Sequence, residues 1–153
     1  MMLAMTETET QATTVAIASV EAEFGVMFNR VRASMRDRAA RVHPDLQPGS
    51  YVILSTLART GPMHASALAE LLATDKSIVS RQAKQLEQAG LLVRAQDPDD
   101  KRATFFDVSP QARDRLNEVR LSDQAALHAQ LGTWSVADLD RLAELLARVN
   151  ETL

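Results

Sequence analysis

The chain has 153 residues, a formal net charge of −3 and no cysteine. This length favours one domain, and the lack of cysteine excludes a disulfide framework, a cysteine-based zinc site and a thiol redox switch. Hydrophobic residues make up 46% of the chain and aromatic residues only 4%, so we expect a largely aliphatic core. Five glycines and five prolines leave little room for a turn-rich β fold, and the richness in Ala, Leu, Glu, Arg and Gln favours a mainly helical one.

The first residues carry neither the basic start nor the apolar run of a signal peptide. The apolar runs also stay well below the roughly 20 residues needed to span a bilayer. We therefore expect a cytoplasmic protein whose residues 1–12 form a mobile tail.

A long helix is predicted from residue 13 to residue 42. Its apolar positions recur at steps of four, three, four and four, at Val20, Phe24, Met27, Val31 and Met35. A helix of about eight turns is too long to be covered by one small core. Part of this stripe is therefore expected to meet another chain.

Prolines at 44 and 48 break the helix, and Pro48 suits the first turn of a second one. That helix should stop at residues 60–62, and a further short helix is predicted over residues 64–73, with His64 as its N-cap. Thr74 and Asp75 then supply N-cap chemistry for a helix over 76–89, and Gly90 is placed to cap its end.

The helix over 76–89 has two distinct faces. At 100° per residue, the outward side carries hydroxyls, amides and cations, at Ser77, Ser80, Arg81, Lys84 and Gln88. The inward side carries Ile78, Val79, Ala83, Leu86 and Ala89. Two short helices joined by a tight turn, the second exposing such residues, are typical of a helix-turn-helix that reads the major groove of DNA.

Two strands are predicted next, over residues 91–96 and 103–108, joined by the polar turn DPDDKR. A hairpin directly after a recognition helix indicates a wing. Arg102 at its tip could enter the minor groove, oriented by Asp100. Residues 76–102 carry six cations and four anions, which modestly favours contact with nucleic acid.

Two more helices should complete the chain. Ser109 and Pro110 begin the first, which runs to about Leu131, and the capping-box pattern from Ser135 to Asp138 begins the second. The last helix has a coiled-coil-like seam at Leu139, Leu142, Leu146, Val149 and Leu153. This seam and the stripe of the first helix predict a homodimer, unless the two helices pack on each other within one chain.

The run from LAELL through DKSIVSR, LEQAGLLVR and DPDDKR to SPQAR resembles the winged helix-turn-helix of MarR-type bacterial transcriptional regulators. The resemblance implies one continuous domain. Within it, residues 13–47 and 110–153 would form a helical dimerisation region, and residues 48–109 the winged helix-turn-helix. It also implies a homodimer on a pseudo-palindromic operator, usually acting as a repressor. In many members a small phenolic or anionic ligand releases the DNA.

The residues assigned on this basis fall into three sets. Contacts to DNA are expected from Lys76, Ser77, Ser80, Arg81, Lys84, Arg94, Lys101 and Arg102, with Asp100 as wing support. The dimer interface is expected at Val20, Phe24, Met27, Leu139, Leu142, Leu146 and Val149. A pocket for a small-molecule effector is suggested at Phe28, His43, Tyr51 and Leu54.

Other classes of function find less support in the sequence. The three histidines, His43, His64 and His128, are scattered without metal-ligand spacing, and motifs for nucleotide binding or acyl transfer are missing. We therefore expect no catalysis, cofactor or metal. A winged-helix dimer that binds protein instead of DNA stays open as an alternative; Arg102→Ala should then leave function intact.

Overall fold

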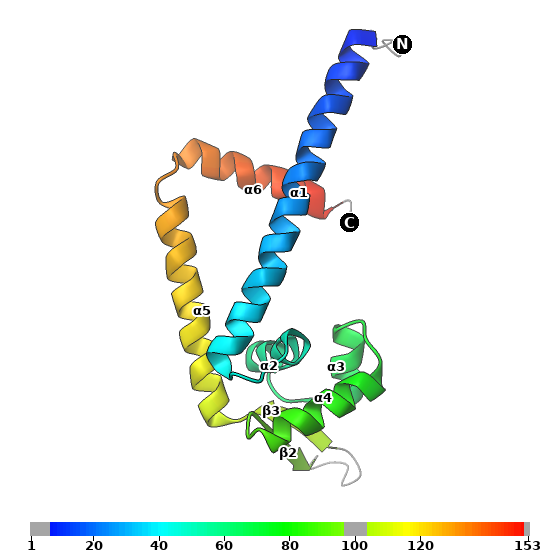
Figure 1. The fold of residues 1–153 in the computed structure, drawn as a ribbon, viewed down its shortest axis with the longest axis vertical. Helices are drawn as coiled ribbons and strands as arrows, with labels where there is room; N and C mark the ends of the chain where they lie inside the picture. The colour runs from blue at the N-terminus through cyan, green and yellow to red at the C-terminus, as the bar shows by residue number, and fades with distance from the viewer. Residues whose placement is uncertain (1–6, 97–103, 152–153) are drawn as a thin grey trace. The chain divides into compact units, whose positions relative to one another are not determined.

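The computed structural model describes residues 7–96 and 104–151. It is mainly helical with one small antiparallel sheet, as predicted (Figure 1). The helices are α1 (Glu7–Val42), α2 (Pro48–Thr60), α3 (Ala65–Leu71), α4 (Lys76–Gln88), α5 (Pro110–Leu131) and α6 (Val136–Asn150). The strands are β1 (Met63–His64), β2 (Leu92–Gln96) and β3 (Thr104–Val108).

The chain divides into two compact units, residues 1–53 and 54–153, and the division falls inside α2. None of the helices in the described part of the chain is long and apolar enough to cross a membrane.

In the first unit, α1 begins at Glu7, whereas the sequence predicted a tail up to residue 12. The threonines of this stretch fit a helix because their hydroxyls donate to carbonyls one turn back. Thr13 Oγ1 lies 2.8 Å from Glu9 O, and Thr14 Oγ1 lies 2.9 Å from Thr10 O. Residues 7–12 therefore belong to α1, and residues 1–6 lie outside the described part.

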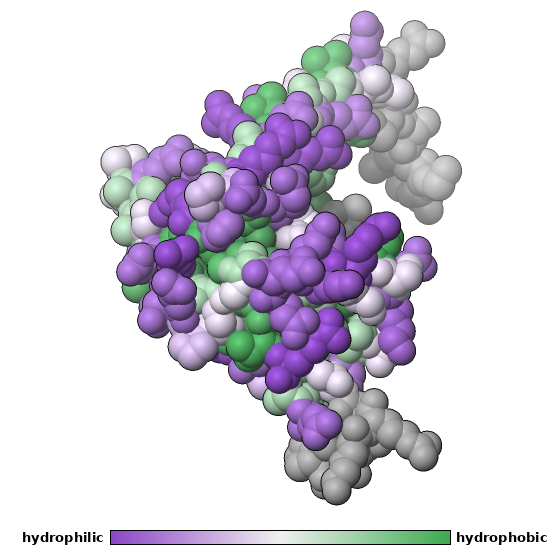
Figure 2. All heavy atoms as spheres, turned by 60° about the horizontal axis from the view of Figure 1, so that its bottom comes forward, coloured by the Kyte–Doolittle hydropathy of each residue, from purple (hydrophilic) through white to green (hydrophobic). Residues whose placement is uncertain are grey.

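Apolar side chains are exposed on more than one side of α1. The predicted stripe is largely uncovered, with Val20 54% exposed and Met27 42% exposed. The neighbours Val26 and Phe28 are also exposed, although successive residues point about 100° apart. Figure 2 accordingly shows green apolar side chains among purple ones on the surface of the molecule.

In the second unit, the end of α2 leads through β1 into α3 and α4. The core here includes Leu54, Leu57, Leu68 and Val79, which are fully buried. The stop at residues 60–62 is confirmed, and Gly61 adopts a φ of +88°, a conformation that glycine accepts without strain.

Two predicted N-caps act differently in the structure. His64 occupies the N-cap position of α3 but makes no side-chain capping bond. Its Nδ1 instead lies 3.3 Å from Thr104 O, and its ring stacks on Phe105 with centroids 4.0 Å apart. The reason is that His64 belongs to β1, which pairs with β3. Asp75 is likewise the N-cap of α4 without a side-chain hydrogen bond.

The sheet has the strand order β1–β3–β2, and both pairings are antiparallel. The hairpin of β2 and β3 was predicted. The two-residue strand β1 was not, because so short a strand leaves no periodic signal. The register pairs Leu92 with Val108 and Arg94 with Phe106, and these four side chains therefore share one face.

Both C-terminal helices begin as predicted. Ser109 Oγ accepts a hydrogen bond from Ala112 N at 3.3 Å, and Pro110 opens α5. Ser135 Oγ accepts from Asp138 N at 3.1 Å and donates to Asp138 Oδ2 at 2.6 Å, which fixes the start of α6. None of the described residues of α6 is buried, so its apolar seam is not part of the core of this chain.

Candidate nucleic-acid interface

Helix α4 presents the predicted polar face to solvent. Its outward side chains are exposed, at Lys76, Ser77, Ser80, Arg81, Lys84 and Gln88, and the inward Val79, Ala83 and Leu86 are buried. Ala89, predicted to face inward, is exposed because the helix ends at Gln88. The first turn carries no acidic residue, and the nearest carboxylate is that of the N-cap Asp75, which partly offsets the partial positive charge of the helix N-terminus.

The end of α4 is fixed by its backbone. Gly90 has a φ of +69°, Gly90 N donates to Glu87 O at 3.0 Å, and Leu91 N donates to Leu86 O at 2.9 Å. This pair of bonds is the Schellman motif, which favours glycine at the left-handed position. The predicted role of Gly90 is thus confirmed, and β2 follows α4 after a short rigid link.

Arg94 on β2 contacts α4 in a way that the sequence did not predict. Its Nε donates to Glu87 Oε2 at 2.8 Å, and its guanidinium lies over the ring of Phe106, 5.0 Å from the centroid. Each partner comes from a different element, so the contact depends on the sheet register and on the link through Gly90. An arginine assigned to DNA is therefore also part of the fold.

Lys101, Arg102 and Asp100 lie outside the described residues. The described parts of the hairpin end at Gln96 and begin again at Thr104, which are paired. The assigned roles of the three tip residues stay predictions.

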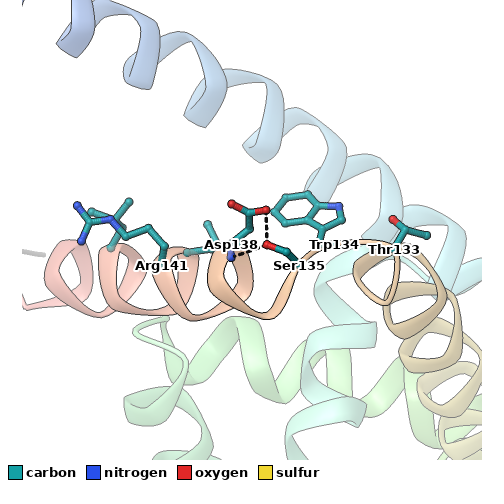
Figure 3. A pocket seen from close by; sticks show the side chains of 7 residues that line it. Thr133, Trp134, Ser135, Asp138 and Arg141 are labelled. Carbon is teal, nitrogen blue, oxygen red and sulfur yellow. Dashed lines mark hydrogen bonds between the residues drawn. The ribbon is translucent and has the colours of Figure 1, made fainter.

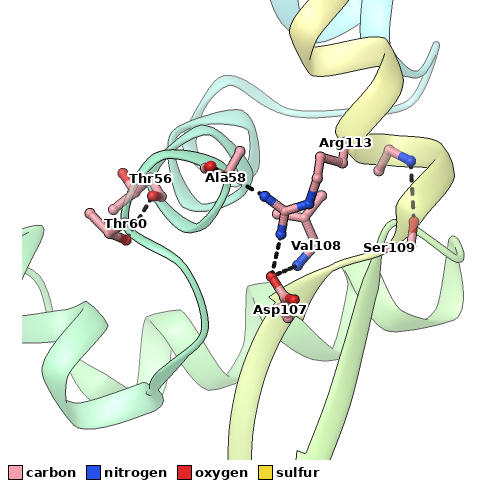
Figure 4. A network of polar contacts seen from close by, with 8 residues as sticks. Thr56, Ala58, Thr60, Asp107, Val108, Ser109 and Arg113 are labelled. Carbon is pink, nitrogen blue, oxygen red and sulfur yellow. Dashed lines mark hydrogen bonds and ion pairs between the residues drawn. The ribbon is translucent and has the colours of Figure 1, made fainter.

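A cluster of polar contacts links strand β3 of the wing to helices α2 and α5 (Figure 4). Arg113 of α5 donates through Nη2 to Asp107 Oδ1 at 2.6 Å and through Nη1 to Ala58 O at 3.2 Å. The same Asp107 oxygen accepts from Val108 N at 2.7 Å. Arg113 thus joins β3, the end of α2 and the first turn of α5.

This cluster was not predicted from the sequence, although the position of Arg113 in α5 gives one signal for it. Arg113 lies in the first turn of α5, where the helix dipole disfavours a cation. A cation at such a place indicates an anionic partner from another element. The sequence cannot say which carboxylate, because the pairing depends on where β3 ends.

The residues assigned to a dimer interface are only partly covered. On α6, Leu146 is 41% exposed, and Leu139, Leu142 and Val149 are partly exposed. A hollow at the start of α6 is lined by Thr133, Trp134, Ser135, Asp138, Arg141, Leu142 and Leu145. Figure 3 shows the indole of Trp134 and the carboxylate of Asp138 projecting from the same side of this turn.

The residues assigned to an effector pocket differ in their surroundings. Tyr51 and Leu54 are buried in the core. Phe28 is 56% exposed and its ring lies 6.1 Å from that of Phe24. His43 Nδ1 accepts from Asp45 N at 3.2 Å. The effector pocket therefore stays a prediction for these four residues.

A separate cavity of about 300 Å³ lies within the first unit. Its walls come from α1 and the start of α2, at Val31, Arg32, Met35, Arg36, Pro48, Gly49 and Val52. The lining is largely apolar, with two guanidinium groups one helical turn apart. In the described part of the chain, no three histidine or carboxylate side chains are grouped so that they could hold a metal ion.

Helix-turn-helix, hairpin and flanking helices together define a winged helix-turn-helix protein. Residues 46–104 match the model of the MarR family. The uncharacterized HTH-type transcriptional regulator YxaD of Bacillus subtilis is 31% identical over 120 residues, which cover 78% of this chain and 84% of YxaD. The chain therefore belongs to the MarR family of transcriptional regulators.

Solved structures agree on the fold. The MarR family transcription regulator SP03579 has a TM-score of 0.77 at 21% identity, covering 94% of this chain and 93% of its own. FabT of Streptococcus pneumoniae, solved in complex with DNA, has a TM-score of 0.78 at 14% identity, covering 89% of this chain and 96% of its own. The predicted family and fold class are thus confirmed, and this family regulates transcription rather than catalysing reactions.

Proposed function

We propose that this chain is a cytoplasmic, sequence-specific regulator that binds double-stranded DNA as a homodimer on a pseudo-palindromic operator. The observation that carries the proposal is the exposed face of α4, with its hydroxyls and cations and an acid-free first turn. FabT, which shares the fold, was solved with DNA bound. Each copy inserts α4 into the major groove and Arg102 into the minor groove.

The side chains on α4 contact different parts of the DNA according to their chemistry. Arg81 can donate two parallel hydrogen bonds to a guanine edge, which supplies sequence preference. Lys76 and Lys84 reach phosphates, and Ser77 and Ser80 donate to phosphate or base. Since the whole chain has a net charge of −3, binding depends on this local cationic face and weakens as salt screens it.

Dimerisation uses residues 13–47 and 110–153, and residues 48–109 contact DNA. The exposed apolar residues of α1 support this, since exposed apolar patches commonly mark an interface. The seam of α6, which lacks a buried residue among those described, supports it as well. Two-fold symmetry then places the half-sites about ten base pairs apart.

The regulator acts as a repressor, and binding of a small molecule releases it from DNA. The 300 Å³ cavity is a second candidate effector site, in addition to the predicted pocket. Its apolar walls and two guanidinium groups suit an amphipathic anion. Arg32 and Arg36 are neighbours of like charge on one helix face, a repulsion that a bound anion relieves.

The first test is fluorescence anisotropy with the DNA that flanks the gene for this protein, or with a duplex selected from random sequences. A scrambled duplex is the control, and a salt series is run with both. We expect tight binding to one segment, two chains per site and a steep fall of affinity with salt. Equal or absent binding to all duplexes at low salt would contradict the proposal and favour a protein-binding winged helix.

A further inference from the structure

The guanidinium group of Arg94 is held in a fixed place at the base of the wing. Nε–H donates to Glu87 Oε2 at 2.8 Å on one edge, and the ring of Phe106 lies beneath, 5.0 Å from Cζ to the centroid. Phe106 is only 4% exposed and is the direct cross-strand partner of Arg94. The guanidinium therefore lies over a buried aromatic side chain of the core.

Among the described residues, most donors of this guanidinium have no partner. An arginine side chain has five N–H donors, of which Nε–H supplies one. Within residues 7–96 and 104–151, the four donors on the terminal nitrogens have no hydrogen-bond partner. Arg94 is exposed to solvent, and its ion pair with Glu87 links it to α4.

We infer that Glu87 is a positioning residue for DNA binding. Its carboxylate fixes Arg94 so that the terminal nitrogens meet a phosphate oxygen beside α4, a role that rests on the proposed function. A free arginine loses much rotamer freedom when a ligand orders it. Glu87 and Phe106 remove that freedom before the DNA arrives.

Electrostatic repulsion by Glu87 would have the opposite effect on DNA binding. An acidic side chain beside a DNA-binding helix repels phosphate, and a carboxylate paired with arginine reduces the charge that phosphate attracts. On that reading the removal of Glu87 strengthens binding. Positioning and repulsion thus predict effects of opposite sign, so a single substitution separates them.

The experiment measures affinity for the selected duplex across a salt series, for wild type and for variants. We expect Glu87→Ala to weaken binding about three- to tenfold. Glu87→Gln retains an acceptor for Nε–H and should recover most of the affinity. The matched control is Glu70→Ala on α3, which removes an exposed acid that has no arginine partner among the described residues and should not weaken binding.

A second comparison distinguishes positioning from a general effect on the fold. In an Arg94→Ala background, Glu87→Ala should weaken binding no further, because no arginine is left to position. Arg94→Ala itself should lower the slope of log affinity against log salt by about 0.9, the loss of one phosphate contact. Thermal unfolding of each variant shows whether the protein is folded at the assay temperature.

The inference is overturned if Glu87→Ala binds as tightly as wild type or more tightly, or if the loss persists without Arg94. Either result leaves the proposed function standing, since wild type still binds its duplex. A wild-type protein that binds no duplex overturns the proposed function, and the role of Glu87 with it.

Discussion

Arg113 provides a direct test of how the wing is attached. Arg113→Met keeps the apolar stem and a similar helix propensity but removes both hydrogen bonds, at 2.6 Å to Asp107 Oδ1 and 3.2 Å to Ala58 O. The control is Arg141→Met on α6, which removes a bond of 3.3 Å to the Glu144 carboxylate.

The two sites differ in exposure as well as in the number of hydrogen bonds. The Arg113 and Asp107 side chains are 41% and 30% exposed, and those of Arg141 and Glu144 are 64% and 67% exposed. A buried hydrogen bond to a charged group contributes about 1.5–3 kcal/mol, which solvent reduces at a site exposed by a third. We therefore expect Arg113→Met to cost about 1–2 kcal/mol and Arg141→Met less than about 0.5 kcal/mol.

The assay is thermal unfolding by circular dichroism at one fixed protein concentration, because assembly of chains also stabilises. For a chain of this size, the expected loss corresponds to a fall in Tm of about 2–8 °C for Arg113→Met and under about 2 °C for Arg141→Met. Equal shifts for the two variants would refute the reasoning, since the Arg113 cluster would then contribute no more than a surface ion pair.

Three further predictions concern DNA, assembly and the end of α4. Arg81→Ala should cost about 1–3 kcal/mol of specific binding in the anisotropy assay while binding to a random duplex changes much less; an unchanged preference would remove Arg81 from base readout. Leu146→Asp should lower the dimer fraction in sedimentation equilibrium, because it puts a charge on the exposed seam of α6, and an unaltered assembly would place the interface elsewhere. Gly90→Ala should cost about 1 kcal/mol in chemical denaturation because of its φ of +69°, whereas Gly25→Ala, inside α1, should not destabilise.

Much of the fold could be read from local sequence. Ser109, Ser135 and Gly90 mark helix ends by capping chemistry that involves only near neighbours, and the structure has these ends where they were predicted. The start of α1 was missed because Thr13 and Thr14 can serve either a tail or a helix, and only their bonds to the preceding turn decide.

The candidate site, like the fold, could be predicted from the sequence only in part. The exposed face of α4 follows from the constant angle between successive residues of a helix, so the sequence alone predicts which of its side chains point outward. The partners of Arg94 and Arg113 cannot be predicted in this way, because the strand register decides which residues lie beside them. Arg94 contacts Glu87 and Phe106, and Arg113 contacts Asp107. His64 occupies its predicted N-cap position, but its ring contacts Thr104 and Phe105 of β3 instead of capping α3, and strand pairing decides this as well.

The separation of the two faces of α4 has a consequence for how new binding preferences can arise. The side chains that hold this helix in place, Val79, Ala83 and Leu86, are different from those that point outward. Outward positions can therefore change identity without creating a cavity or burying a polar atom, so such changes carry little cost in folding. On the proposed function, a gene duplicate of this protein would acquire a different operator through a few surface substitutions, with the interior unaltered.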